Sequence, residues 1–340
     1  MQITEPQPNI IRIVPILPDS IASIDDQCAA VLALMRIALR DHPLLRGKFK
    51  DSVQWFYSPM TAPSLLGKFG GRGVVYDCMD ELANFRFAPA DIAAREQFLL
   101  SHADVVFTGG YQLFKSKSRH HDNVQFYGCG VDVAHFGRAR LAQTQVPATV
   151  AQLPRPVFGY FGVIDERLDY PLIAGMARAF PHASIVMAGP VAKVDPDQLP
   201  QMPNIHWLGQ QPYESLPNLV KGFDVCLMPF ALNDATRYIN PTKTLEYMAA
   251  GKPVVSTAVA DVVHNFTPVV AVAESHQAFF AAVDRAWRKP DPVLIDEGVR
   301  RAQGSSWTAT VRMMRGAIQA ALHRPAGVAG AIAVEAGAVQ

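Results

Sequence analysis

The feature that most limits the fold of this chain is a repeating order of short apolar runs and longer helical stretches. Most of the runs are continuous rather than alternating, as in Val105–Thr108 and Val225–Pro229. A strand that is apolar on both faces is typical of a parallel sheet covered by helices on both sides. The repeated order of strand, helix and strand therefore predicts doubly wound α/β domains. The expected strands are Ile10–Leu17, Val53–Tyr57, Gly73–Asp77, Val105–Thr108, Val124–Tyr127, Val157–Gly162, Ser184–Gly189, Ile205–Leu208, Val225–Pro229 and Val254–Thr257, and the expected helices include Asp25–Arg40, Pro89–His102, Tyr170–Phe180 and Thr242–Ala250.

The length and composition allow two domains with sizeable buried cores. Of 340 residues, 49% are hydrophobic and 18% are charged, which excludes a disordered chain. Basic and acidic residues are nearly equal in number, 31 and 30, so neither half has the basic excess typical of nucleic-acid binding. No apolar run approaches the ~20 residues that span a bilayer, and the first residues do not form a signal-peptide pattern. We expect a cytoplasmic protein without a transmembrane segment, able to associate peripherally with the inner face of the membrane.

The cysteines and histidines do not form a metal-binding pattern. Cys28, Cys78, Cys129 and Cys226 are widely separated, lie in apolar contexts and form no CxxC pair. We interpret them as reduced and buried side chains. The ten histidines are dispersed as well, and we expect no metal site.

The two groups of expected strands are separated by a segment that predicts an interdomain linker. Residues 138–156 are rich in Ala, Gln, Thr and Pro and contain no run that predicts a strand. We therefore expect an N-terminal Rossmann-like domain over 1–137, a second one over 157–305 and a C-terminal helix over 306–323 that packs back on the first domain. The tail, 324–340, is rich in small residues and is expected to be flexible. Open sheets of this kind bind ligands beyond the carboxyl ends of their strands.

The most informative motif is the predicted start of a helix at Asn240. Asn240 fits an N-cap, and Pro241 fits the first helical position, where no backbone N–H is needed. Thr242 and Lys243 then lie in a first turn whose free N–H groups and dipole attract anions. Glu246 lies one turn further along the same face, where its carboxylate can accept hydrogen bonds from the hydroxyls of a ribose. The motif predicts a seat for a nucleoside diphosphate, and the alternative is a capped helix whose Lys243 and Glu246 form a surface ion pair.

The block that contains Glu246 resembles a known family. Leu245–Thr257 is similar to the EA-G-PVV block of GT-B glycosyltransferases, in particular glycosyltransferase family 4 of the bacterial group 1 type. In that family the glutamate that matches Glu246 binds the ribose of the nucleotide-sugar donor. The resemblance covers Gly73 to Ile318 and implies two facing Rossmann-like domains, one for the acceptor and one for the donor. Weaker matches follow in the order of the family and are Gly130–Asp132, Phe158–Gly162, Ile185–Pro190, Asn204–Gly209 and Asp224–Pro229.

The first departure from the family pattern concerns a second glutamate. The family often has one eight positions before the residue that matches Glu246, and this chain has Tyr238 there. A tyrosine cannot act as a carboxylate, so the donor sugar and the stereochemistry do not follow from the resemblance. The neighbouring Arg237 is a candidate contact to phosphate or sugar.

The second departure lies after the glycine turn that begins at Gly162. The family has an arginine next to this glycine, and the chain has Val163. Arg167 lies near the place of a family lysine and can form a bidentate contact to phosphate. The alternative is that Arg167 is exposed and pairs with a neighbouring aspartate. Lys193 is a third basic candidate for the donor site.

The third departure is at the N-terminus. The family opens with a strand and a glycine-rich loop, whereas Asn9–Pro15 looks like a later strand of that domain. We therefore expect the first domain to lack its first strand unit, and we hypothesise that activity is weakened or lost.

The block Tyr76–Leu82 supplies the candidate catalytic residues, Asp77 and Asp80. It follows an apolar run, so both aspartates are expected at the carboxyl end of a strand, where a carboxylate can bind acceptor hydroxyls or act as a base. The block also looks like a recurring motif within a subset of bacterial glycosyltransferases. The alternative is a capping or turn role for the two aspartates.

The resemblance implies an enzyme, a glycosyltransferase of the hexosyltransferase type. It implies transfer from a nucleoside diphosphate sugar to a hydroxyl of a carbohydrate or lipid-linked acceptor, with retention of configuration and no cofactor besides this co-substrate. The implied context is assembly of a surface polysaccharide or glycoconjugate. Two alternatives stay open: a non-catalytic GT-B partner that binds nucleotide, and a nucleotide-sugar epimerase.

Overall fold

The computed structural model describes most of the chain as two compact units. The predicted tail, 324–340, lies outside the described residues. The first unit comprises residues 1–108, 113–126 and 314–323 of the described chain, and the second comprises 109–112 and 127–313. The described residues are 1–49, 51–85, 87–234 and 236–323.

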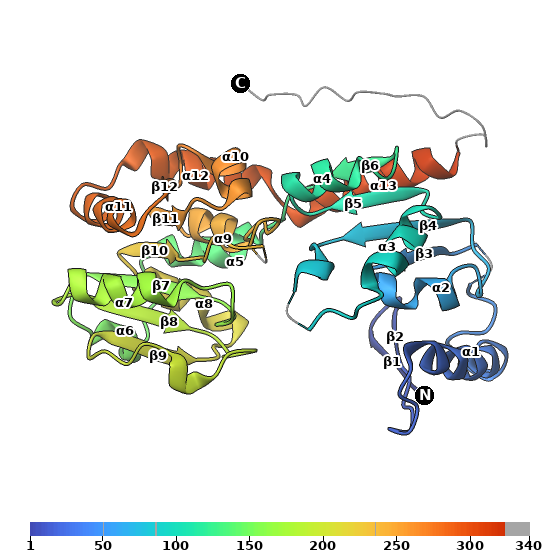
Figure 1. Ribbon diagram of the computed structural model, residues 1–340. Helices are drawn as coiled ribbons and strands as arrows, with labels where there is room; N and C mark the ends of the chain where they lie inside the picture. The colour runs from blue at the N-terminus through green and yellow to red at the C-terminus, as the bar shows by residue number, and fades with distance from the viewer. Residues whose placement is uncertain (50, 86, 235, 324–340) are drawn as a thin grey trace. The chain divides into compact units, whose positions relative to one another are not determined.

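The first unit contains a four-stranded parallel sheet (Figure 1). Its central strands are apolar on both faces, as predicted, and Val75, Val105 and Val106 are almost completely buried. The strands follow one another across the sheet in the order β3 (Val53–Phe56), β4 (Gly73–Cys78), β5 (Val105–Thr108) and β6 (Val124–Phe126). The helices between them are η1 (Pro59–Thr61), α2 (Ala62–Leu65), η2 (Leu82–Asn84), α3 (Ile92–Leu100) and α4 (Tyr111–Lys117).

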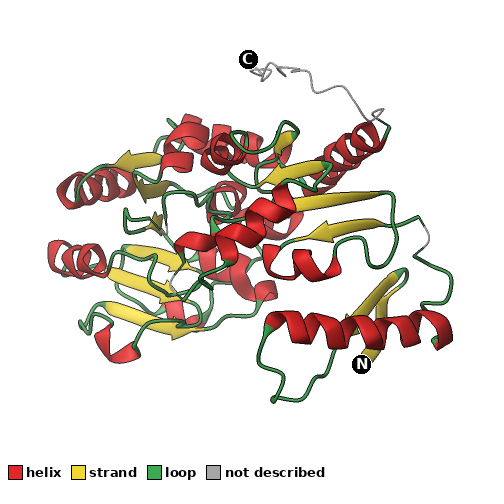
Figure 2. Cartoon of the chain, turned by 45° about the vertical axis from the view of Figure 1, so that its right-hand side comes forward, coloured by secondary structure: helices red, strands yellow, loops and turns green. Residues whose placement is uncertain are grey.

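The strand that we expect at Ile10–Leu17 lies outside this parallel sheet. It forms β2 (Ile10–Val14), which pairs antiparallel with β1 (Gln2–Gln7) in a two-stranded sheet beside α1 (Ile24–Asp41), as Figures 1 and 2 show. The physical reason is that β2 alternates between exposed and half-buried residues, with Ile10 52% exposed. Such a strand suits an open hairpin and not a sheet covered on both faces. The parallel sheet of the first unit therefore begins at Val53 and has four strands, against six in the sheet of the second unit.

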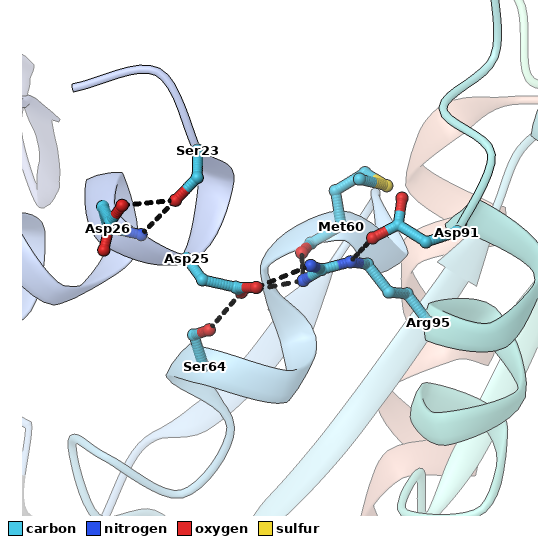
Figure 3. Close-up of polar contacts among 7 residues, drawn as sticks. All are labelled: Ser23, Asp25, Asp26, Met60, Ser64, Asp91 and Arg95. Carbon is cyan, nitrogen blue, oxygen red and sulfur yellow. Dashed lines mark hydrogen bonds and ion pairs between the residues drawn. The ribbon is translucent and has the colours of Figure 1, made fainter. Parts of the chain in front are cut away.

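A single arginine joins three helical segments of the first unit (Figure 3). Arg95 on α3 donates to both carboxylate oxygens of Asp25 on α1, at 3.0 and 2.8 Å, and to the Met60 carbonyl oxygen at 2.9 Å. Asp91 accepts a further hydrogen bond from Arg95 at 2.6 Å, and Ser64 donates to Asp25. The guanidinium lowers the pKa of Asp25 to about 2. These contacts fix α1 to the helical segments that connect the strands of the parallel sheet. The strand before α1, β2, is not part of that sheet.

The second unit is built on a six-stranded parallel sheet. Five of its strands match the sequence expectation, and the edge strand β12 is one that we did not predict. Its helices are α7 (Tyr170–Ala179), α8 (Leu216–Lys221), α9 (Lys243–Ala249), α10 (Ala260–Phe266), α11 (His276–Arg288) and α12 (Pro292–Gly304), with the short turns η4 (Pro196–Gln198) and η5 (Tyr213–Ser215). The strands lie in the order β12 (Ala271–Ala273), β11 (Val254–Thr257), β10 (Val225–Met228), β7 (Val157–Phe161), β8 (Ser184–Ala188) and β9 (Ile205–Gly209).

The contact boundary between the units lies before the predicted linker. Residues 138–156 contain η3 (Arg138–Arg140) and α6 (Ala148–Ala151) and are counted with the second unit, as is α5 (Val133–Gly137). Phe136 and Val150 are buried in the core of that unit, so these apolar side chains tie the segment to the second sheet. The helix that we expect at 306–323 is α13 (Trp307–Leu322), of which the part from residue 314 onward is counted with the first unit.

Candidate nucleotide-binding site

The strand order of the second unit defines where a ligand is expected. From β7 the chain adds β8 and β9 on one side, and then returns to add β10, β11 and β12 on the other. The loops that leave the carboxyl ends of β7 and β10 therefore diverge, which is the usual ligand position in an open parallel sheet. Gly162 follows β7 directly, and the segment after β10 leads into α9.

Two glycines bring the backbones of neighbouring loops into close contact at this position. Gly162 and Gly189 follow β7 and β8 and have φ angles of +147° and +152°. A Cβ atom on Gly189 would lie 1.8 Å from the carbonyl oxygen of Gly162, and one on Gly162 would lie 2.1 Å from Cε of Lys243. Only glycine fits at either position. The Lys243 side chain therefore lies directly against the glycine turn that we predicted in the donor site.

Lys243 and Glu246 are both largely withdrawn from solvent. Burial lowers the pKa of Lys243, partly offset by the nearby Glu246 carboxylate, and burial raises the pKa of Glu246, partly offset by Lys243. Oε2 of Glu246 is buried and accepts no hydrogen bond from any described residue. The two side chains form no ion pair within 4.0 Å among the contacts of the described chain. The surface ion pair that is the alternative is therefore wrong, because the two side chains are half-buried and form no such pair among the described contacts.

The cap of this helix differs from the prediction. The N-cap of α9 is Thr242 and not Asn240, and no side chain caps the helix. Asn240 instead donates from Nδ2 to the Gly109 carbonyl oxygen at 2.8 Å, and its Oδ1 is buried without a partner in the described chain. Pro241 still begins the turn, since its carbonyl oxygen accepts from the Thr244 N–H at 3.1 Å. Asn240 is thus held by a loop and not turned toward the helix amides.

Arg167 has a carboxylate partner within its own loop. Its Nε and Nη2 donate to the Asp165 carboxylate at 3.0 and 2.7 Å, and Asp165 is only 4% exposed. This is the aspartate pair that we kept as the alternative for Arg167. Both residues lie close enough to Lys243 to influence its pKa, Arg167 lowering it and Asp165 raising it. A phosphate contact by Arg167 stays a prediction.

Lys193 and Arg237 lie in loops at the carboxyl ends of strands. Lys193 has a φ of +59°, and its Nζ lies 3.6 Å from Oε1 of Glu166. Both carboxylate oxygens of Glu166 are buried and accept no hydrogen bond within the described part of the chain. The sequence did not indicate this residue, although it adjoins Arg167. Arg237 is exposed, and its guanidinium lies over the Tyr238 ring, 5.6 Å from the centroid. No contact assigns either basic residue to a ligand.

Asp77 and Asp80 belong to the first unit. Asp77 is the residue before the last one of strand β4 and is only 8% exposed, and its carboxylate accepts from Trp55 Nε1 at 3.2 Å. Burial raises the pKa of Asp77. Asp80 follows the strand, and its backbone oxygen accepts from the Cys78 thiol at 3.5 Å. Asp77 therefore lies at the carboxyl end of a strand, as expected.

A buried charge cluster beneath this motif was not predicted. Lys117 on α4 is 3% exposed and donates to Glu81 at 2.7 Å and to Glu96 at 2.8 Å. Tyr76 donates from its hydroxyl to Glu96 at 2.6 Å, and the Cys78 thiol lies 3.8 Å from the same carboxylate. Burial raises the pKa of Cys78 to about 12, so the thiol is protonated at neutral pH. Three residues of the predicted motif, Tyr76, Cys78 and Glu81, therefore contact this cluster and hold the loop after β4 in place.

Two further properties of the described residues concern membranes and metals. Within the described ranges, no helix is long and apolar enough to cross a membrane. In the same part of the chain, no group of three or more His, Cys, Asp or Glu side chains could hold a metal ion.

Comparison with solved structures identifies the architecture. Sucrose-phosphate synthase from Thermosynechococcus elongatus superposes with a TM-score of 0.71 at 15% identity, over 94% of this chain and 85% of that one. The HepE protein of Anabaena, in complex with UDP, gives a TM-score of 0.66 at 13% identity, over 87% and 83%. The chain has the GT-B fold. The predicted class of two Rossmann-like α/β units is therefore confirmed.

Sequence comparisons place the family resemblance in the second unit of this GT-B protein. Residues 155–289 match the family model described as Glycosyl transferases group 1. The chain is also similar to the putative teichuronic acid biosynthesis glycosyltransferase TuaH of Bacillus subtilis (strain 168), with 26% identity over 221 residues. That match covers 60% of this chain and 54% of TuaH, so the chain spans about half the length of this curated relative. The group 1 resemblance that we predicted from the motif around Glu246 is confirmed.

Proposed function

We propose that this protein is a glycosyltransferase that moves a hexose from a nucleoside diphosphate sugar to an acceptor hydroxyl. The observation that carries the proposal is the pair of withdrawn charges on α9, Lys243 and Glu246, which form no ion pair with any described residue and lie beside the glycine turn at Gly162. A buried carboxylate oxygen without a donor is costly unless a ligand supplies one. The group 1 match over this segment and the UDP bound to the similarly folded HepE support the proposal.

In this proposal, the two charged residues of α9 bind different parts of the donor. Glu246 accepts hydrogen bonds from the ribose hydroxyls, and Lys243 neutralises the diphosphate. Because Gly162 has no side chain, the phosphates can approach the backbone of its turn. As the bond between the anomeric carbon and the phosphate oxygen breaks, negative charge grows on the diphosphate, and a fixed cation stabilises that charge. We assign no metal or further cofactor to this step, since Lys243 and Arg167 are the positive groups around the turn.

Acceptor chemistry is assigned to the first unit. An acceptor hydroxyl that attacks the anomeric carbon must lose its proton, and Asp77 is the carboxylate that we propose to receive it. Burial raises the pKa of Asp77 and makes it a better base than an exposed aspartate. Asp80 is proposed as a contact to acceptor hydroxyls. Retention of configuration belongs to the same proposal and requires the acceptor oxygen to attack the anomeric carbon from the face that the diphosphate leaves. A role in surface polysaccharide assembly, as the name of TuaH suggests, and association with the inner face of the membrane also belong to it.

The test of the donor site is a thermal-shift titration with UDP, GDP, ADP and dTDP. At 100 times its dissociation constant, a nucleotide that binds only the folded state adds about 2.7 kcal/mol to stability. We expect one of these nucleotides to raise the melting temperature and Glu246→Ala to weaken its binding about 10- to 100-fold, because charge-assisted hydrogen bonds are lost. Glu274→Ala is the matched control, since Glu274 is exposed in the same unit. If no nucleotide shifts the parent protein, or if Glu246→Ala and Glu274→Ala bind equally well, the donor site is assigned wrongly.

The test of the acceptor side is Asp77→Asn. The amide keeps an oxygen that can accept from Trp55, so we expect stability to change by less than about 1 kcal/mol. Loss of the base should lower the rate of sugar transfer about 10²- to 10⁴-fold without weakening nucleotide binding. Asp122→Asn, at an exposed position of the same unit, should leave the rate unchanged. An undiminished rate in Asp77→Asn would exclude Asp77, and a parent protein that binds nucleotide but transfers no sugar would favour the non-catalytic partner, which Tyr238 also favours.

A further inference from the structure

The second unit contains a pocket at the edge of the sheet opposite to the donor site. Its volume is about 510 Å³, which falls in the range of small-molecule pockets. Val254 and Ala271, the first residues of β11 and β12, lie in its wall, so the pocket is at the amino ends of these strands. The donor-site residues Lys243, Glu246 and Gly162 do not line it.

The wall of this amino-end pocket is largely apolar. Helices α11 and α12 contribute part of it, and three prolines lie in the loops around it. Prolines restrict the backbone, so the pocket is expected to be preformed. The apolar residues that matter for the argument are Val254, Val269, Ala282, Ala286, Leu294 and Ile295, and the loop prolines are Pro253, Pro268 and Pro290.

Two cationic side chains at the C-terminal end of α11, Arg285 and Lys289, line this pocket. Arg285 and Lys289 are both exposed, and neither forms an ion pair with any described residue. Other arginines on the same helices do have partners: Arg288 pairs with Asp284, and Arg301 pairs with Glu297.

The remaining charged side chains of the lining are already engaged. Lys252 donates from Nζ to the carbonyl oxygens of Lys221 and Phe223, at 2.9 and 2.7 Å. The Asp291 carboxylate accepts from the N–H groups of Val293 and Leu294 as the cap of α12. The charge left for a ligand is therefore positive.

We propose that this pocket binds an amphiphile with one apolar chain and one anionic head group. An apolar molecule alone would leave Arg285 and Lys289 unused, and a small anion alone would leave the apolar wall in contact with water. A molecule with both parts covers the wall with its chain and pairs its head with the two cations. The source of such a molecule is either a free amphiphile or a lipid of a membrane surface. The proposal does not depend on the donor site.

The experiment uses dodecyl phosphate below its critical micelle concentration, titrated calorimetrically into the full chain. We expect saturable binding of dodecyl phosphate. In the double variant Arg285→Gln/Lys289→Gln, this binding should be about tenfold weaker or more, because both charged contacts are lost. Ala286→Phe fills the pocket and should abolish binding with little change in melting temperature, since Ala286 is only half-buried. The matched control is Arg178→Gln, an exposed arginine in the last turn of α7, which should bind as the parent does.

Each control ligand removes one half of the proposed chemistry. Inorganic phosphate has the head without the chain, and dodecyl maltoside has the chain with a neutral head, so both should bind at least about tenfold more weakly than dodecyl phosphate. Equal binding of dodecyl maltoside, unchanged binding in the double variant or in Ala286→Phe, or no binding of dodecyl phosphate would overturn the proposal. Co-sedimentation with vesicles of phosphatidylcholine and phosphatidylglycerol, but not with phosphatidylcholine alone, would identify a membrane as the source. Binding of the monomer without co-sedimentation would identify a free amphiphile.

Discussion

Lys117→Met is expected to destabilise the first unit by about 3–5 kcal/mol, because it leaves two carboxylates, whose side chains are only 14% exposed, without their cation. Lys117 is 3% exposed and binds Glu81 and Glu96 at 2.7 and 2.8 Å. Burial by itself lowers the pKa of Lys117, but Cys78 and the two glutamates outweigh it, so the pKa lies above the ordinary 10.5. A raised lysine pKa stabilises the folded state fully below pH 10.5, and this contribution disappears as the pH rises through the folded-state value. The loss in the variant is therefore expected at neutral pH.

The measurement is hydrogen exchange of the amides in β4 and β5, which follows the first unit separately from the second. Lys68→Met is the control, since Lys68 is exposed in the same unit, and it should change stability by less than about 0.5 kcal/mol. Adding Glu81→Gln and Glu96→Gln to Lys117→Met removes the stranded charges and should restore part of the stability. A cost below about 1 kcal/mol for Lys117→Met would show that the cluster is not the electrostatic support of this unit.

The sequence predicted the fold wherever one strand could be recognised without its neighbours. Buried runs such as Val105–Thr108 and Val225–Pro229 are strands close to the expected bounds, because continuous apolar runs require cover on both faces. Ile10–Leu17 has an apolar run as well, but its pairing depends on β1 and on a turn at Asn9, which has a φ of +67°. The edge strand β12 has only three residues, and so short a run does not stand out from its surroundings.

The candidate site was predictable where its residues are close in sequence. Lys243 and Glu246 lie on one short helix, so their spacing alone places them together. The partner of Asn240 is Gly109, which is 131 residues away, and no local pattern indicates such a contact. Lys117 was missed for the same reason, since its carboxylates lie 36 and 21 residues earlier. The burial of Lys117 results from tertiary packing, which no local sequence pattern indicates.

Gly189→Ala is expected to destabilise the second unit by about 3–5 kcal/mol, from backbone strain and from steric overlap together. Gly189 has a φ of +152°, which side chains of L-residues rarely allow, and its new Cβ would lie 1.8 Å from the Gly162 carbonyl oxygen. A backbone atom cannot turn away as the end of a side chain can, so the two loops must separate.

Gly209→Ala separates the two causes of this loss. Gly209 also has a positive φ, +65°, but a Cβ there would meet no atom within 4 Å. It should therefore cost only about 1 kcal/mol, from the strain alone. Chemical denaturation of both variants, followed by hydrogen exchange in β7 and β8, measures the difference. Equal costs would mean that the loops separate easily and that Gly162 is not held by its neighbour. If they differ as expected, Gly189→Ala should also weaken nucleotide binding at temperatures where it is still folded, because moving Gly162 displaces the surface on which Lys243 lies.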